Sequence, residues 1–170
     1  MISHRPFLAS GAALLALLVP HAAAYEYPPI DAEVAASVEA CVLSAVEQSS
    51  DGAACIGLMF DVCEGNAGTT YSMSACFLQE HDFWQSMIVR TFEAVSEEYR
   101  SSDRRSVLEE PLSESLATAQ AAWGAYAEAQ CQFAYDKFGA GSIRNIEAAA
   151  CKRNLAAERA IFLRGLSAEG

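Results

Sequence analysis

The chain has 170 residues, of which 11 are Lys or Arg and 22 are Asp or Glu, so its formal net charge at pH 7 is −11. This length suits one domain with a single hydrophobic core. The acidic excess disfavours nucleic acid and anionic membrane surfaces as partners, and it favours a cationic protein.

The first 24 residues have the pattern of a secretory signal. His4 and Arg5 precede the apolar run FLASGAALLALLV, and residues 22–24 are the small alanines that a signal peptidase accepts. The run is shorter than the roughly 20 residues of a spanning helix, which disfavours the alternative of a retained membrane anchor. We therefore expect cleavage before Tyr25, a periplasmic or secreted location and no membrane association afterwards. Loss of Arg5 would lower the net charge from −11 to −12.

The next segments predict two helices, of which the second is short. Residues 25–30 include Pro28-Pro29 and should form an extended lead-in. Asp31 can cap a first helix, whose apolar residues recur at helical spacing until residues 49–52 interrupt it. A second helix is expected around residues 53–63, and a loop over residues 64–70.

The clearest helical period covers residues 72–100. One face of this helix is apolar except for Glu80 and Thr91. The apolar members of that face are Met73, Cys76, Phe77, Phe83, Trp84, Met87, Ile88, Phe92, Val95 and Tyr99.

Two further helices are predicted after a polar connection over residues 101–110. Pro111 can open the first, which extends to Phe138. Gly139 and Gly141 can adopt left-handed backbone angles, and Ser142 can cap a last helix ending near residue 166. The expected inward residues are Leu112, Leu116, Ala119, Trp123, Tyr126, Gln130 and Phe133 or Ala134 in the first helix, and Ile143, Ile146, Ala150, Leu155, Phe162 and Leu166 in the second.

The predicted architecture is all-α. Residues 31–166 should form a single-domain, irregular bundle of about five helices, because no segment has the alternating pattern of a strand. All six cysteines follow the signal, and an even count in an exported chain favours three disulfides. Chain order and helix placement favour the pairs Cys41–Cys55, Cys63–Cys76 and Cys131–Cys151. A redox or metal role is the alternative, which the absence of a C-x2-C pair disfavours.

The order of several residues resembles the LprI-like lysozyme inhibitors, a family of small exported bacterial proteins. The resemblance is carried by Trp123, Tyr126, Cys131, the Gly141-Ser142 turn, Cys151 and Arg159, and upstream by Cys63, Cys76 and Glu80. It covers residues 63–166, so Cys41 and Cys55 form an additional pair. Family members commonly have an arginine where this chain has Ala127 and a threonine where it has Ala156.

Glu80 and Arg159 are two charges within otherwise apolar helical faces. A buried charge is costly unless it is paired, so we expect these two side chains to meet in the core. The alternative is that Arg159 extends along its stem to reach water.

The residue pattern does not favour an enzyme or a cofactor site. After the signal the chain has one histidine, His81, and its adjacent carboxylates lie in polar stretches typical of solvated faces. We expect no catalytic, cofactor or metal site. Trp84, Trp123 and Tyr126 could form a sugar platform, but their helical spacing favours the core.

Binding is therefore the predicted function. The resemblance implies a lysozyme inhibitor, and the negative charge suits lysozyme or another cationic envelope protein as its partner. Candidate contacts are Glu93, Glu97, Glu98, Glu109 and Glu110, together with the loop over residues 64–70. The alternative is a periplasmic structural or assembly-assisting protein that binds another envelope protein.

Overall fold

The computed structural model describes residues 30–65, 68–104 and 110–167. The expected signal and all but the last residue of the lead-in lie outside these ranges. The helices are α1 (Ala32–Glu47), the 3-10 turn η1 (Ala53–Cys55), α2 (Leu58–Glu64), α3 (Thr70–Asp103), α4 (Leu112–Asp136) and α5 (Ile143–Leu166). The described residues contain no strand, and the prediction of an all-α bundle of about five helices is confirmed.

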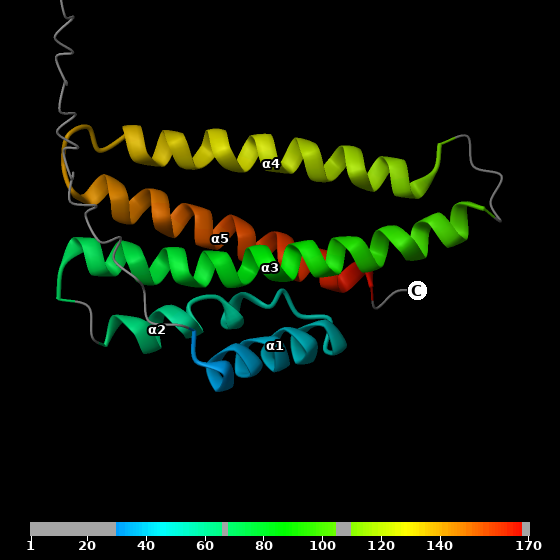
Figure 1. The fold of residues 1–170 in the computed structure, drawn as a ribbon, viewed down its shortest axis with the longest axis horizontal. Coiled ribbons are helices and arrows are strands. Elements are labelled where there is room, and N and C mark those ends of the chain that lie inside the picture. The colour runs from blue at the N-terminus through cyan, green and yellow to red at the C-terminus, as the bar shows by residue number, and fades with distance from the viewer. Residues whose placement is uncertain (1–29, 66–67, 105–109, 168–170) are drawn as a thin grey trace, which may run out of the picture.

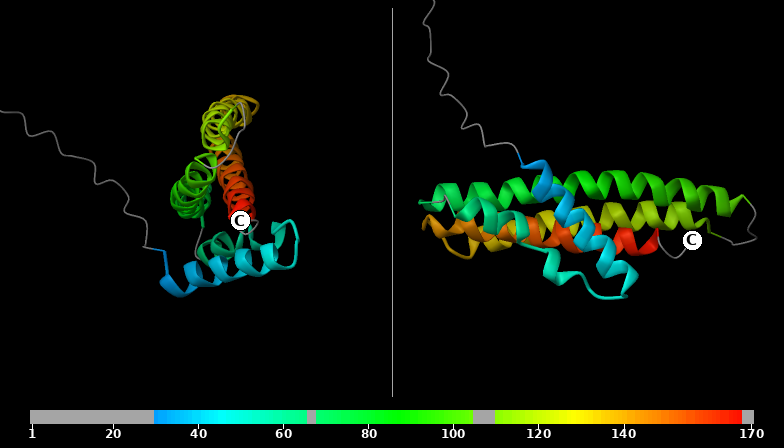
Figure 2. Two further views of the ribbon diagram at one scale, coloured as in Figure 1. Left: turned by 90° about the vertical axis from the view of Figure 1, so that its right-hand side faces the viewer. Right: turned by 90° about the horizontal axis from the view of Figure 1, so that it is seen from below.

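Three long helices form the body of the bundle. In Figure 1, α5 lies lengthwise between α3 and α4, and α1 and α2 cover the opposite side of α3 and α5 from α4. Figure 2 shows α1 crossing the long helices at an angle rather than running parallel to them. The fold therefore has a long three-helix layer and a short N-terminal layer, which comprises α1, η1 and α2.

The N-terminal caps of α1 and α3 follow from their sequences. The Asp31 carboxylate accepts a hydrogen bond from the Glu33 backbone N–H, so the predicted cap of α1 is confirmed. Thr69 and Ser72 form a reciprocal capping box at the start of α3. These caps satisfy backbone donors that a helix N-terminus otherwise leaves without partners.

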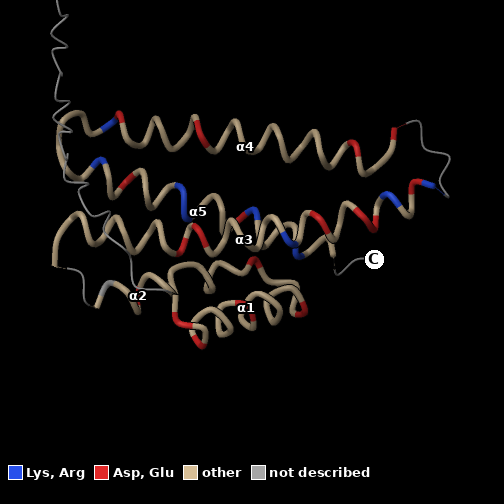
Figure 3. Tube along the Cα trace, viewed as in Figure 1, with Lys and Arg blue, Asp and Glu red and all other residues tan. Residues whose placement is uncertain are grey.

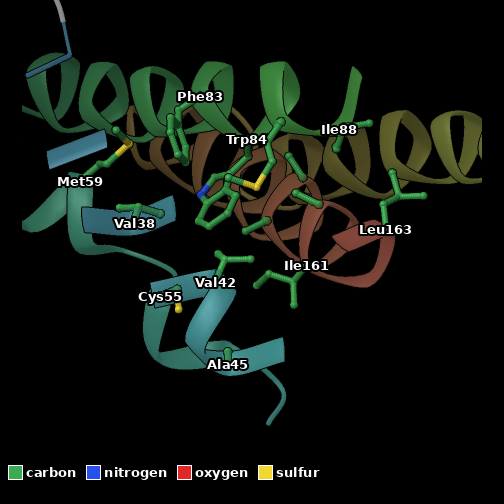
Figure 4. Packing of buried hydrophobic residues seen from close by; sticks show 14 of the residues in the cluster. Val38, Val42, Ala45, Cys55, Met59, Phe83, Trp84, Ile88, Ile161 and Leu163 are labelled. Carbon is green, nitrogen blue, oxygen red and sulfur yellow. The ribbon is translucent and has the colours of Figure 1, made fainter. Parts of the chain in front are cut away.

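The core lies where α3, α5 and α1 meet. Trp84 of α3 is fully buried among Val38 and Val42 of α1 and Ile161 of α5 (Figure 4). The buried residues of α3 include most of the predicted apolar face and its polar exceptions Glu80 and Thr91. Three predicted members are only half-buried, and three residues outside the predicted face are buried as well: Met73, Phe92 and Tyr99 in the first group, and Ser74, Ala75 and Ser96 in the second. The buried face of α5 is instead rich in alanine, and these small side chains let α5 pack closely against α3.

The predicted inward faces of α4 and α5 are partly wrong. Leu112, Tyr126 and Phe133 of α4 are exposed, and Ile143 and Phe162 of α5 are exposed as well. Both helices carry alanine on several faces, so bulky residues alone do not reveal which face is covered. The side that α4 turns to the bundle holds Leu116, Gln120, Trp123, Ala127 and Cys131, which are its buried or half-buried residues from Leu116 to Cys131.

Two local predictions about turns are also corrected. The single helix expected over residues 53–63 is two elements, because Ile56 is extended and Gly57 has a φ of +102°. Gly139 has the predicted left-handed angle, with a φ of +56°, but Gly141 does not share it. Ser142 precedes α5 without a side-chain capping bond, because its backbone is already helical there.

Three disulfides connect neighbouring elements. Cys41 of α1 bonds to Cys55 of η1, Cys63 of α2 to Cys76 of α3, and Cys131 of α4 to Cys151 of α5. These are the pairs that chain order favours. Each loop of this length stabilises a fold by about 3 kcal/mol in the chain-entropy model, by restricting the unfolded chain.

Candidate partner-binding site

Glu80 is a buried hydrogen-bond centre at the start of α2. Its carboxylate has no solvent exposure and accepts bonds from the backbone N–H of Gly57 at 2.7 Å and of Phe60 at 3.0 Å. The indole N–H of Trp84 donates a third bond, at 3.0 Å. Glu80 therefore acts as the cap of α2 from a different helix, because Gly57 offers no side chain for that role.

The cation that faces Glu80 is Arg153, and the predicted pairing of Glu80 with Arg159 is wrong. Nη1 of Arg153 lies 3.4 Å from Oε2 of Glu80, and the guanidinium lies over the Phe77 ring, 5.0 Å from its centroid. Phe77 in turn stacks on Phe60. Both arginines belong to α5, so their sequence pattern did not reveal which one faces α3.

Arg159 instead joins α5 to α4. Its Nε donates to the side-chain oxygen of Gln120 at 2.8 Å, and its guanidinium lies 5.8 Å from the Trp123 ring centroid and 5.0 Å from that of Phe162. Burial lowers the pKa of Arg159 from its ordinary value. The expected core role of the aromatic residues therefore holds for Trp84, and in part for Trp123, which is half-buried, but not for Tyr126.

The candidate acidic contacts lie near the projecting end of two helices. The end of α3 and the start of α4 extend past the end of α5 in Figure 1, and we call this region the α3–α4 end. Glu93, Glu97 and Glu110 are exposed, and Glu98 is half-buried. Glu97 pairs with Arg100 at 3.0 Å. Glu109 lies outside the described residues.

Asp103 fixes the geometry of the α3–α4 end, a role that the sequence analysis missed. Its carboxylate accepts bonds from the Ser113 hydroxyl at 2.6 Å and from the backbone N–H groups of Ser113 and Leu112 at 3.0 and 2.8 Å. The bonds from Ser113 are the main reason that the pKa of Asp103 lies below its ordinary value. The only signal in the sequence is that Pro111 has no side-chain acceptor to cap α4.

The N-terminal layer is uniformly acidic. Residues 31–64 contain seven Asp or Glu and no Lys or Arg. Figure 3 shows the red positions of α1 with no blue position beside them on the same helix. One of these carboxylates, that of Glu39, pairs across the layers with Arg90 of α3 at 2.8 Å.

α4 presents an exposed line of apolar side chains to the outside. Leu112, Ala119, Tyr126 and Phe133 recur every seven residues, a spacing that keeps them along one side of a helix. The exposed fractions are 42% for Leu112, 55% for Tyr126 and 63% for Phe133. These four residues, which we call the α4 line, were predicted to face inward and are left uncovered by the bundle, as is Gln130.

The described residues contain neither a metal-ligating cluster nor a membrane-spanning helix. They contain no group of three or more His, Cys, Asp or Glu placed to hold a metal ion. None of their helices combines the length and the hydrophobicity needed to cross a membrane. His81 lies on α3, with its ring nitrogens near Asp82 and Gln85.

Comparison with known families gives a match over much of the chain. The model of the family described as lysozyme inhibitor LprI matches residues 63–163, from the end of α2 through most of α5. Comparisons with curated proteins and with solved structures gave no match. α1, η1 and the Cys41–Cys55 disulfide precede the matched range, so the acidic N-terminal layer is largely an addition to it.

Proposed function

The chain belongs to the LprI lysozyme inhibitor family, and on that premise we propose that its exported, mature form binds a cationic lysozyme and blocks its sugar-binding cleft. The family is one of inhibitors, and the present proposal adds the partner's charge and the mode of inhibition. Many lysozymes are strongly cationic, and opposite net charges accelerate the association of two proteins. The net charge of −11 is the observation that carries the proposal.

The shape of the α3–α4 end supports occlusion of the cleft. A convex end can enter a cleft, whereas a flat face cannot. Glu97 and Glu110 are exposed there, and Glu93 is exposed one helical turn before Glu97 on α3. We propose that these three residues contact the lysozyme together with Glu98 and Glu109. Because Asp103 ties the start of α4 to the end of α3, this end is held in one geometry before it meets a partner.

The disulfides support both the location and the mode of action. Disulfides form and persist in oxidising compartments, which suits a periplasmic or secreted inhibitor. They also hold the helices in fixed relative positions, and a preorganised surface loses less conformational entropy on binding.

A turbidity assay tests the proposal directly. The oxidised mature chain should slow the clearing of cell walls by a cationic lysozyme, and the effect should weaken when the salt concentration rises from low to near-molar, because salt screens exposed charges. Absence of inhibition with every lysozyme tested would contradict the proposal. That result would favour a structural or assembly-assisting protein that binds another envelope protein.

A charge-matched pair of variants separates local contacts from net charge. The triple variant Glu93→Gln, Glu97→Gln and Glu110→Gln removes three charges from the α3–α4 end. The control Glu33→Gln, Glu47→Gln and Asp61→Asn removes three exposed charges from the N-terminal layer. We expect the first to weaken inhibition more than the second. Equal effects would mean that the α3–α4 end is not the contact site.

A further inference from the structure

We propose that the α4 line is the apolar part of the docking surface for lysozyme, with Tyr126 and Phe133 as its anchoring side chains. This inference rests on the proposed function and specifies which surface holds the partner after the acidic residues have attracted it. The line begins at Leu112, at the α3–α4 end, and continues from there along α4 to Phe133.

Tyr126 and Phe133 are unusual among the aromatic residues of the described chain. More than half of each side chain is exposed, and neither has a hydrogen bond or a ring contact within the described residues. Between them along this side of α4 lie Ala129 and Gln130, which are both exposed. An aromatic ring can bury 150–250 Å² of surface, and tyrosine is enriched among the residues that dominate binding energy.

The bundle holds α4 rigidly by its other side. Cys131 is bonded to Cys151, Gln120 accepts a bond from Arg159, and Asp103 caps the first turn. None of these contacts uses a residue of the α4 line other than the backbone N–H of Leu112. The rings therefore project from a fixed helix, an arrangement that lowers the entropic cost of docking.

Charge selects the occupant of this surface. The charged residues of α4 are Glu114, Glu128 and Asp136, which are all exposed, and the helix contains no Lys or Arg. A second copy of this chain would bring two acidic helices together, and an anionic membrane would also be repelled. A cationic protein is the partner whose charge complements α4, which agrees with the lysozyme of the proposed function.

Binding kinetics at two salt concentrations test whether the acidic residues control the association rate and the aromatic residues control the dissociation rate. Immobilised cationic lysozyme would be exposed to the oxidised mature chain and to the double variant Tyr126→Ala/Phe133→Ala. We expect the double variant to bind at least about 30-fold more weakly, mainly through faster dissociation, and to show the same deficit at high salt. The triple variant of the α3–α4 end should instead associate more slowly than the parent at low salt. At high salt its affinity should equal that of the parent.

The control for the double variant is Tyr71→Ala, because Tyr71 is an aromatic residue of similar exposure on α3. It should change the affinity by less than about threefold, and circular dichroism should show unchanged helicity in all variants. If the double variant binds as tightly as the parent, the inference fails while the inhibitor function stands. If the parent binds no lysozyme, both fail. A concentration-dependent dimer that the double variant abolishes would assign the α4 line to a second copy and overturn the inference.

Discussion

Arg153 and Glu80 form an ion pair in which the carboxylate is fully buried and the guanidinium lies against the ring of Phe77. The pair joins residues that are 73 positions apart in the sequence. The same carboxylate accepts hydrogen bonds from the backbone N–H groups at the start of α2. One side chain of α3 thus fixes the positions of α2 and α5. Most of α5 lies within the range that the family model matches, whereas only the last two residues of α2 do.

Glu80→Gln should destabilise the fold by about 3 kcal/mol, because breaking a buried pair leaves the other charge without its counter-charge. The amide oxygen can still accept the two bonds at its position, but the NH2 group would face a backbone N–H together with either the Trp84 indole N–H or the Arg153 guanidinium, and all of these are donors. Equilibrium urea unfolding of the oxidised protein measures the change. Glu93→Gln is the matched control on the same helix, and its exposed side chain should leave the unfolding free energy nearly unchanged.

Asp103 should make the stability depend on pH in the acidic range. The folded pKa lies below the ordinary value of 3.8, so the stabilisation is fully present above that value and is lost as the pH falls through the folded pKa. Ser113→Ala removes the largest cause of the shift. We expect its melting temperature to be lower than that of the parent at neutral pH and to converge on it as the pH falls below 3.8 and through the folded pKa of Asp103. Ser115 is an exposed neighbour on α4, so the melting temperature of Ser115→Ala should vary with pH in parallel with that of the parent. A constant gap between Ser113→Ala and the parent at every pH would show that the hydroxyl acts only through packing.

Two of the disulfides should differ in their effect on function. Replacing both Cys131 and Cys151 by serine should cost about 3 kcal/mol of stability and also weaken lysozyme binding, because it frees α4 from α5. Replacing both Cys41 and Cys55 should cost a similar amount but preserve binding, because this pair precedes the range matched by the family model. Unfolding and binding are to be measured at a temperature where both variants are folded. Loss of binding in both would place part of the contact surface on the N-terminal layer.

The sequence was most informative where one helix face differs clearly from the others. The face of α3 that includes Trp84 and Glu80 is buried as predicted, because bulky apolar residues recur there at helical spacing. α4 is different, since alanine occurs on several of its faces and its bulky residues form both a covered and an exposed line. In such a helix, hydrophobic periodicity is too weak to indicate which line faces the core. Contact with α5 determines which line is covered.

The centres of the polar network were harder to predict than the helices. Glu80 was recognised as a buried charge in need of a partner, but the choice between Arg153 and Arg159 depends on how α5 is rotated against α3. Asp103 could not be found from local patterns, because it caps a helix that begins nine residues later. A cap from a distant residue depends on the path of the connecting chain, and that path cannot be predicted from the local sequence.

Ser49→Gly should stabilise the protein by about 0.5–1 kcal/mol. Ser49 has a φ of +53° just after α1, the left-handed conformation in which a side chain is costly and glycine is the usual residue. The backbone bonds from Ser49 to Val46 and from Ser50 to Ala45 complete the helix-terminating motif, and glycine would preserve both. The gain is smaller than the full conformational penalty, because glycine also increases the entropy of the unfolded chain. Ser50→Gly is the control, because Ser50 does not have a positive φ and its hydroxyl donates to the Ala45 carbonyl, so this variant should be destabilised. Urea unfolding of both variants measures the difference, and a loss of stability in Ser49→Gly would mean that the Ser49 side chain makes a stabilising interaction that outweighs its backbone strain.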